Sequence, residues 1–279
     1  MNEKLIELLN IYIHNNKKAD ITFYEAVYEI LYNEMNNDKY LAKLVAIPKN
    51  CMLDEKYAEY TKGFGGIFGQ AAYHKARREL VVYERNIDYA KTMETKKLLI
   101  PEIEKLAIYN LGALQALLHE FEHVIQAKMV AEGNDVESTL LRATEATGPD
   151  TTETYHFNLK ERLAQIKSLE RILEISCSIG LDDTVYHYFN EIYQKELFSG
   201  YGTLGVTGKI NTDIDGNTYC KDGETFISPT TYYVEQSGID LETYYSAVDL
   251  IPEDERLKYG LPMTLEEYEA LKNSNNYTK

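Results

Sequence analysis

Two histidines and a glutamate near the middle of the chain have the types and the spacing of a zinc site. The segment HEFEH begins at His119 and ends at His123, inside a stretch with helical periodicity. Four residues turn an α-helix by about 400°, so both imidazoles project from one face and can hold one zinc ion together. Glu120 then lies near enough to take a proton from a metal-polarised water as that water attacks a carbonyl. The spacing predicts zinc-dependent hydrolysis with Glu120 as the general base.

A catalytic zinc site usually has a third protein ligand, for which the sequence offers several residues. No third histidine follows the motif in the pattern HExxHxxGxxH, so we expect an acid on a second helix. Glu161 is the preferred residue because on a helical wheel it aligns with Ala164 and Ser168, whose small side chains let two helices approach closely. Three residues after Asn158, Glu161 also has the position of a capping-box acid. The other candidates for the third ligand are Glu137, Glu145, Glu153 and His156.

The motif and the helix after it resemble a known group of enzymes. The string LHEFEHVIQAK followed by NLKERLA is similar to the gluzincin branch of metallopeptidases, to which thermolysin belongs, and to uncharacterised HExxH proteins of bacterial prophages and mobile elements. The resemblance covers roughly residues 78 to 175, with a longer gap between His123 and Glu161 than thermolysin-like enzymes have. It implies a zincin-like fold with His119, His123 and Glu161 as zinc ligands and Glu120 as the base.

The resemblance also implies two further parts of a peptidase site. In zincins an edge strand beside the motif helix binds the substrate backbone, and residues 79–86 are the candidate, with an ordinary core strand as the alternative. A donor that stabilises the developing oxyanion is also expected. The sequence does not single this donor out among Tyr155, His156, Tyr186, His187 and Tyr201.

Hydrophobic periodicity predicts the elements that must position these residues. A long helix is expected from about residue 98 to 130, with Gly112 marking a kink or break. Residues 41–48 are expected to form a strand, and a hairpin is expected to turn near residues 75–79. Further helices are expected at residues 2–14, 20–36, 136–145, 158–178, 182–197, 239–247 and 264–273, and an irregular or hairpin-like region at 200–232.

These elements predict an α+β fold that is mainly helical. A small antiparallel sheet should pack beside the motif helix, and C-terminal helices should complete the cleft. One domain over residues 1–279 is expected, because no repeat or linker divides the chain. It would consist of an N-terminal helical part (1–60), a metal-site core (61–180) and a helical and irregular C-terminal part (181–279).

Composition excludes several classes of function. The net charge of −16 disfavours nucleic acid and anionic membrane surfaces as partners. The N-terminus has no signal-peptide pattern, no apolar run is long enough to span a bilayer, and the three cysteines have no metal-ligand spacing. We therefore expect a cytoplasmic protein acting on a peptide or protein substrate. The alternatives are a zinc-binding regulatory protein without efficient peptidase activity, and a phage interaction protein whose histidines bind no metal.

Overall fold

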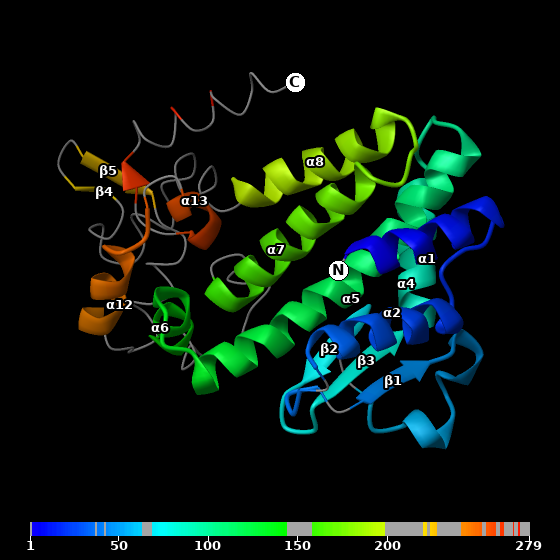
Figure 1. The fold of residues 1–279 in the computed structure, drawn as a ribbon, viewed down its shortest axis with the longest axis horizontal. Helices are drawn as coiled ribbons and strands as arrows, with labels where there is room; N and C mark the ends of the chain where they lie inside the picture. The colour runs from blue at the N-terminus through cyan, green and yellow to red at the C-terminus, as the bar shows by residue number, and fades with distance from the viewer. Residues whose placement is uncertain are drawn as a thin grey trace. The chain divides into compact units, whose positions relative to one another are not determined.

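The fold is given by a computed structural model of the chain (Figure 1). It describes residues 2–36, 38–41, 43–62, 69–143, 158–198, 220–221, 224–227, 241–252, 255–260 and 263–264, together with 270 and 273. Helices predominate and a small sheet accompanies them, which confirms the expected α+β, mainly helical class. Contacts group the chain into two compact units, Met1–Lys128 with Lys167–Tyr193, and Met129–Ile166 with Gln194–Lys279. The single domain expected over the whole chain stays a prediction.

Among the described residues, the first unit holds five helices or parts of helices that the sequence predicts, together with α4 (Glu84–Thr95), which it does not predict. The predicted ones are α1 (Asn2–His14), α2 (Ile21–Glu34), and those parts of α5 (Glu102–Glu132), α7 (Leu159–Ser176) and α8 (Asp183–Leu197) that fall within the bounds of this unit. Two 3₁₀ turns, η1 (Lys49–Cys51) and η2 (Glu55–Tyr57), follow the first strand. Helix α2 begins where Asp20 accepts a hydrogen bond from the Phe23 amide at 3.1 Å, as its N-cap position predicts.

The sheet of the first unit has three strands, β1 (Lys43–Ile47), β2 (Ala71–His74) and β3 (Glu79–Tyr83), in the order β1-β3-β2. Strands β2 and β3 form the predicted hairpin, but β1 runs parallel to β3, so the sheet is mixed and not antiparallel as expected. The prediction that residues 79–86 form an edge strand is wrong. Strand β3 is central and buried throughout, and the chain enters α4 directly after it.

Strand β3 contributes side chains to two apolar clusters, one on each face of the sheet. Leu80 and Val82 join the main core, which the helices of the first unit build. Val81 and Tyr83 point the other way and pack with a smaller cluster that consists of Ile47, Met52 and Tyr60. Burial on both faces explains why LVVY is continuously apolar rather than alternating.

Helix α5 is continuous across Gly112, where the sequence suggested a kink or break. A β-carbon at Gly112 would lie 2.9 Å from Cδ of Lys91, a residue of α4 whose side chain is buried. The glycine therefore provides room for the aliphatic part of Lys91 rather than bending the helix.

The second unit has its own small core. Besides its parts of α5, α7 and α8, its elements are α6 (Val136–Ala143), α12 (Leu241–Val248), α13 (Arg256–Tyr259), β4 (Cys220–Lys221), β5 (Glu224–Ile227) and β6 (Met263–Thr264). The core residues are Leu140, Leu141, Leu159, Leu163, Ala247, Val248 and Ile251. Strands β4, β5 and β6 pair in antiparallel fashion, so the region predicted as a helix from 264 begins in a strand, and most of the rest of 264–273 lies outside the described residues.

A buried arginine ties the second unit together. The Arg162 guanidinium donates to the carbonyl oxygens of Leu197 at 2.7 Å and of Leu257 at 2.6 Å. These carbonyls lie in the last turns of α8 and α13, where unpaired C=O groups favour a cation. Helix α7 is therefore anchored at its first turn by a residue next to Glu161.

No helix in the described ranges is both long and apolar enough to cross a lipid bilayer.

Candidate metal centre

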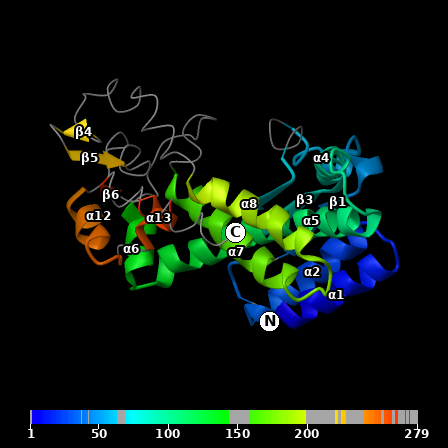
Figure 2. The same ribbon diagram turned by 90° about the horizontal axis from the view of Figure 1, so that it is seen from above.

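Helices α5 and α7 form an antiparallel pair, and this pairing positions the candidate ligands (Figures 1 and 2). Nε2 of Gln115 on α5 donates to Oγ of Ser168 on α7 at 3.1 Å. Around this contact, α5 contributes Leu117, Leu118, Phe121 and Val124 to the same core as Leu169, Ile172 and Ile175 of α7. The small, fully buried Ser168 allows the close approach that the sequence predicted.

The spacing along the two helices then brings the three predicted ligands together. His119 and His123 follow Gln115 by one and two turns of α5, and Glu161 precedes Ser168 by about two turns of α7. One ligand atom from each of the three residues lies within 4.8 Å of the other two. His119 is buried, and the other two are partly buried. Ligand atoms around a tetrahedral zinc stand roughly 3.3 Å apart, a distance within reach of small side-chain rotations.

The His123 ring is oriented by a neighbour one turn further along α5. Nδ1 of His123 lies 2.9 Å from Oε1 of Gln126, whose side chain is 4% exposed. An amide oxygen only accepts, so in this orientation of the amide the contact requires the proton on Nδ1, which is the tautomer that coordinates a metal through Nε2. The rings of His119 and His123 are 4.9 Å apart and nearly perpendicular. Metal-binding histidines are typically held by such a hydrogen bond on the second nitrogen.

Glu120 contacts the sheet. Its Oε2 accepts a hydrogen bond from the backbone N–H of Tyr73 on β2 at 2.8 Å. The Tyr83 amide donates to Gln70 O, so by antiparallel alternation residues 70, 72 and 74 bond to β3, whereas Ala71 and Tyr73 face outward. Glu120 therefore binds the outer edge of β2 and directly follows the candidate ligand His119 in the chain.

Two aromatic side chains near this edge are electrostatically coupled to Glu120. Burial raises the pKa of Tyr83, and the negative charge of Glu120 adds to the rise. Burial lowers the pKa of His74, as does the nearby Arg77, although the charges of Glu79 and Glu120 oppose them. Both shifts favour the neutral form of the side chain, and Nε2 of His74 is buried without a hydrogen-bond partner among the described residues.

Within the described residues, no other candidate from the sequence joins the group of His119, His123 and Glu161. Among the alternative third ligands, Glu137 accepts a hydrogen bond from the Tyr259 hydroxyl at 2.9 Å, and Glu145, Glu153 and His156 lie outside the described residues. Among the candidate oxyanion donors, Tyr186 and His187 lie on α8 with rings 5.7 Å apart. Tyr155 and Tyr201 lie outside the described residues.

Two neighbours of the motif were missed by reasoning from the sequence. Gln126 follows His123 by three residues, and that spacing on a helix was a usable signal for a hydrogen-bond partner. Tyr73 contributes only its backbone amide, and its side chain carries no signal of the contact with Glu120.

Comparison of the chain with protein-family models, with curated protein sequences and with solved structures gives no match in any of the three. The geometry of His119, Glu120, His123 and Glu161 is therefore the basis on which a function can be proposed.

Proposed function

We propose that the chain is a zinc-dependent peptidase in which His119, His123 and Glu161 hold the metal and Glu120 is the general base. The observation that carries the proposal is the convergence of two imidazoles and one carboxylate from two separate helices. Two histidines and one glutamate are the donor set of catalytic zinc sites that keep a coordination position open for water. When bound, zinc supplies a polarised water of lowered pKa and a Lewis acid for the scissile carbonyl.

The residues of the chain itself supply the proton transfer and the placement of the substrate. Glu120 takes the proton of the attacking water and passes it to the leaving amine. The outward carbonyl of Tyr73 and the outward backbone groups of Ala71 pair with the main chain of an extended substrate along β2. The hydrogen bond of Gln126 keeps Nε2 of His123 available for the metal. The reaction is hydrolysis of a peptide bond in a peptide or protein substrate in the cytoplasm.

The test is hydrolysis of quenched fluorescent peptides by the zinc-loaded protein. Glu120→Gln should lower the rate by about 10²- to 10⁴-fold with zinc content unchanged, because the amide still accepts from Tyr73 but takes up no proton. Glu122→Gln, two residues along the same helix, is the matched control and should keep the rate. Undiminished hydrolysis by Glu120→Gln would exclude Glu120 as the base.

A second candidate is a zinc-binding regulatory protein without efficient peptidase activity. The observation that favours it is the engagement of Glu120 with Tyr73, because a carboxylate that only joins a helix to a strand edge needs no chemistry. For that protein, wild type and Glu120→Gln would bind zinc equally and neither would cleave peptides.

A further inference from the structure

The opposite edge of the sheet, at β1, carries outward backbone groups. Lys43 N donates to Arg78 O at 3.4 Å, and β1 pairs with β3 in parallel register from Lys43 to Ile47. Parallel pairing sends the N–H and C=O of alternate residues to the same side. Leu44 and Ala46 therefore direct their backbone groups away from β3. Strand β1 is the last strand on that side, so no described strand accepts these hydrogen bonds.

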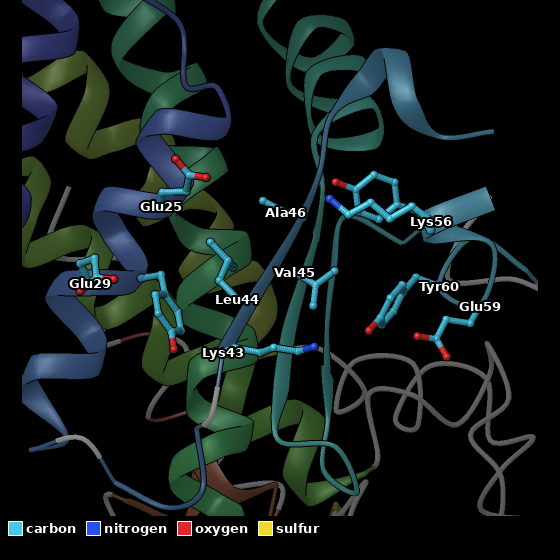
Figure 3. A pocket seen from close by; sticks show the side chains of 11 residues that line it. Glu25, Glu29, Lys43, Leu44, Val45, Ala46, Lys56, Glu59 and Tyr60 are labelled. Atoms are coloured by element: carbon cyan, nitrogen blue, oxygen red, sulfur yellow. The ribbon is translucent and has the colours of Figure 1, made fainter. Parts of the chain in front are cut away.

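A groove of about 820 Å³ runs along this edge (Figure 3). One wall is α2, with Glu25, Tyr28 and Glu29, and the other is the segment 56–60, with tyrosines at 57 and 60. Leu44 points toward the α2 wall and Val45 toward the wall of segment 56–60. An added strand of five residues would be about 17 Å long. Its successive side chains would point to opposite faces, so one face would contact the α2 wall and the other the wall of segment 56–60.

The two walls differ in charge. Glu25 and Glu29 lie one turn apart on α2, both are exposed, and neither has a hydrogen bond or ion pair with another described residue. The ammonium group of Lys43 is engaged by Glu79 at 2.7 Å. Lys56 lies on the tyrosine wall, where its Nζ is 5.0 Å from the ring centre of Tyr57. The α2 wall therefore carries two carboxylates without an ion pair among the described residues. The opposite wall carries two tyrosines, Lys56, and Glu59, whose carboxylate is paired with Arg77 at 2.9 Å.

We infer that this groove binds an extended segment of another protein as a strand added to β1. Alternate residues of that segment are lysine or arginine facing Glu25 and Glu29, and the residues between them are apolar and face Tyr57 and Tyr60. The main chain of the segment pairs with the backbone groups of Leu44 and Ala46. The inference does not rest on the proposed peptidase activity, because β1 and β2 are opposite edges of the sheet.

The first test measures binding of the fluorescent peptide Ac-Lys-Val-Lys-Val-Lys-Val-NH₂ by anisotropy. The Glu120→Gln protein is used beside the wild type, so that hydrolysis does not consume the probe. The same peptide with glutamate in place of lysine should bind at least tenfold more weakly, because it faces Glu25 and Glu29 with like charge. Equal binding of the two peptides would overturn the inference.

Backbone methylation tests the added strand itself. Only alternate N–H groups of such a strand face β1, so one peptide is methylated at every lysine nitrogen and a second at every valine nitrogen. One of the two should lose at least tenfold in affinity and the other should bind within about twofold of the parent. Equal effects of both methylations would overturn the proposal.

Substitutions in the groove locate the site. Glu25→Gln combined with Glu29→Gln should weaken the lysine peptide by roughly three- to tenfold, and Glu7→Gln on α1 is the control that should leave it unchanged. Ala46→Pro removes an outward N–H and should weaken binding at least tenfold. If the peptide binds these variants with the same affinity as the wild type, its site lies outside the groove, and the inference is overturned. The inference would also be overturned if the wild type were a dimer that does not bind the peptide and that Ala46→Pro dissociates, because a second copy of the chain would then occupy the groove.

Discussion

The two edges of the three-stranded sheet differ in what contacts their outward backbone groups. At β2 the outward N–H of Tyr73 is taken by Glu120 of the motif helix at 2.8 Å. At β1 the outward groups of Leu44 and Ala46 have no strand of the described ranges beside them, and both residues line a groove. Unpaired strand edges promote unwanted association, and proteins usually cover or charge them. Here a carboxylate covers part of one edge, whereas charged residues flank the other.

The difference assigns two tasks to the glutamate of the motif. The hydrogen bond to Tyr73 fixes α5 relative to a strand whose remaining outward groups can pair with a peptide backbone. Glu120 also directly follows His119 in the chain, which is why we propose it as the general base. At β1 no carboxylate of the described residues accepts from an outward N–H, so the binding that we infer at that edge involves no catalytic group. On the two proposals made above, one small sheet carries a catalytic edge at β2 and a binding edge at β1.

The largest expected effect comes from proline at adjacent positions of β1. Val45→Pro removes an N–H that bonds to β3 and should lower the free energy of unfolding by roughly 2–4 kcal/mol. Ala46→Pro removes an outward N–H and should change it by less than about 1 kcal/mol. Chemical denaturation of both variants measures the difference. Similar losses in the two variants would show that the outer side of β1 is paired.

A smaller effect is expected at the β2 edge. Glu120→Ala removes the acceptor of the Tyr73 amide and should cost about 1–3 kcal/mol, whereas Glu120→Gln keeps an acceptor and should cost less. Amide hydrogen exchange reports on this directly, because the Tyr73 amide should exchange faster only in the alanine variant. Unchanged protection of Tyr73 in Glu120→Ala would mean that the carboxylate does not hold the edge.

The smallest effect concerns Glu79, a buried carboxylate at the end of β3 beside β1. Burial raises its pKa, but hydrogen bonds from Lys43 and Tyr60 and the charge of Arg77 outweigh burial and hold the pKa below its usual value. A depressed pKa stabilises the fold above the unfolded value of about 4.3, and this contribution disappears as the pH falls through the folded value.

Replacing Glu79 removes this pH-dependent contribution. Glu79→Gln should therefore cost roughly 1–2 kcal/mol at pH 7 and progressively less below about pH 4.3. Urea denaturation of both proteins at several pH values measures the gap between them. A gap that is constant from pH 7 to pH 3 would contradict the depressed pKa.

Local patterns in the sequence predicted the parts of the fold that depend on neighbouring residues. The α5 and α7 helices, the hairpin of β2 and β3, and the cap at Asp20 follow from periodicity, turn residues and capping. The parallel pairing of β1 with β3 joins residues about 36 positions apart, and nothing in LVAI or LVVY specifies it. Helix α4 was missed because it starts at Glu84, directly after β3, without a side-chain cap.

As with the fold, the parts of the candidate site that depend on local spacing were predicted from the sequence, and a contact that depends on strand register was not. The i, i+4 spacing of His119 and His123 is a local property, and the small residues in line with Glu161 indicated the face that packs on α5. The contact of Glu120 with Tyr73 could not be predicted, because it depends on which residues of β2 face outward. That orientation follows from the register with β3 and not from the residue type.

Metal content of the purified protein tests the central claim most directly. Wild type should bind about one zinc per chain, His123→Ala should bind none, and Glu161→Ala should bind it more weakly. His14→Ala and Glu7→Ala change exposed residues of α1 and should keep the zinc content of the wild type. A wild-type protein that holds no zinc after reconstitution, or a Glu161→Ala variant that holds it as tightly as the wild type, would contradict the proposed centre.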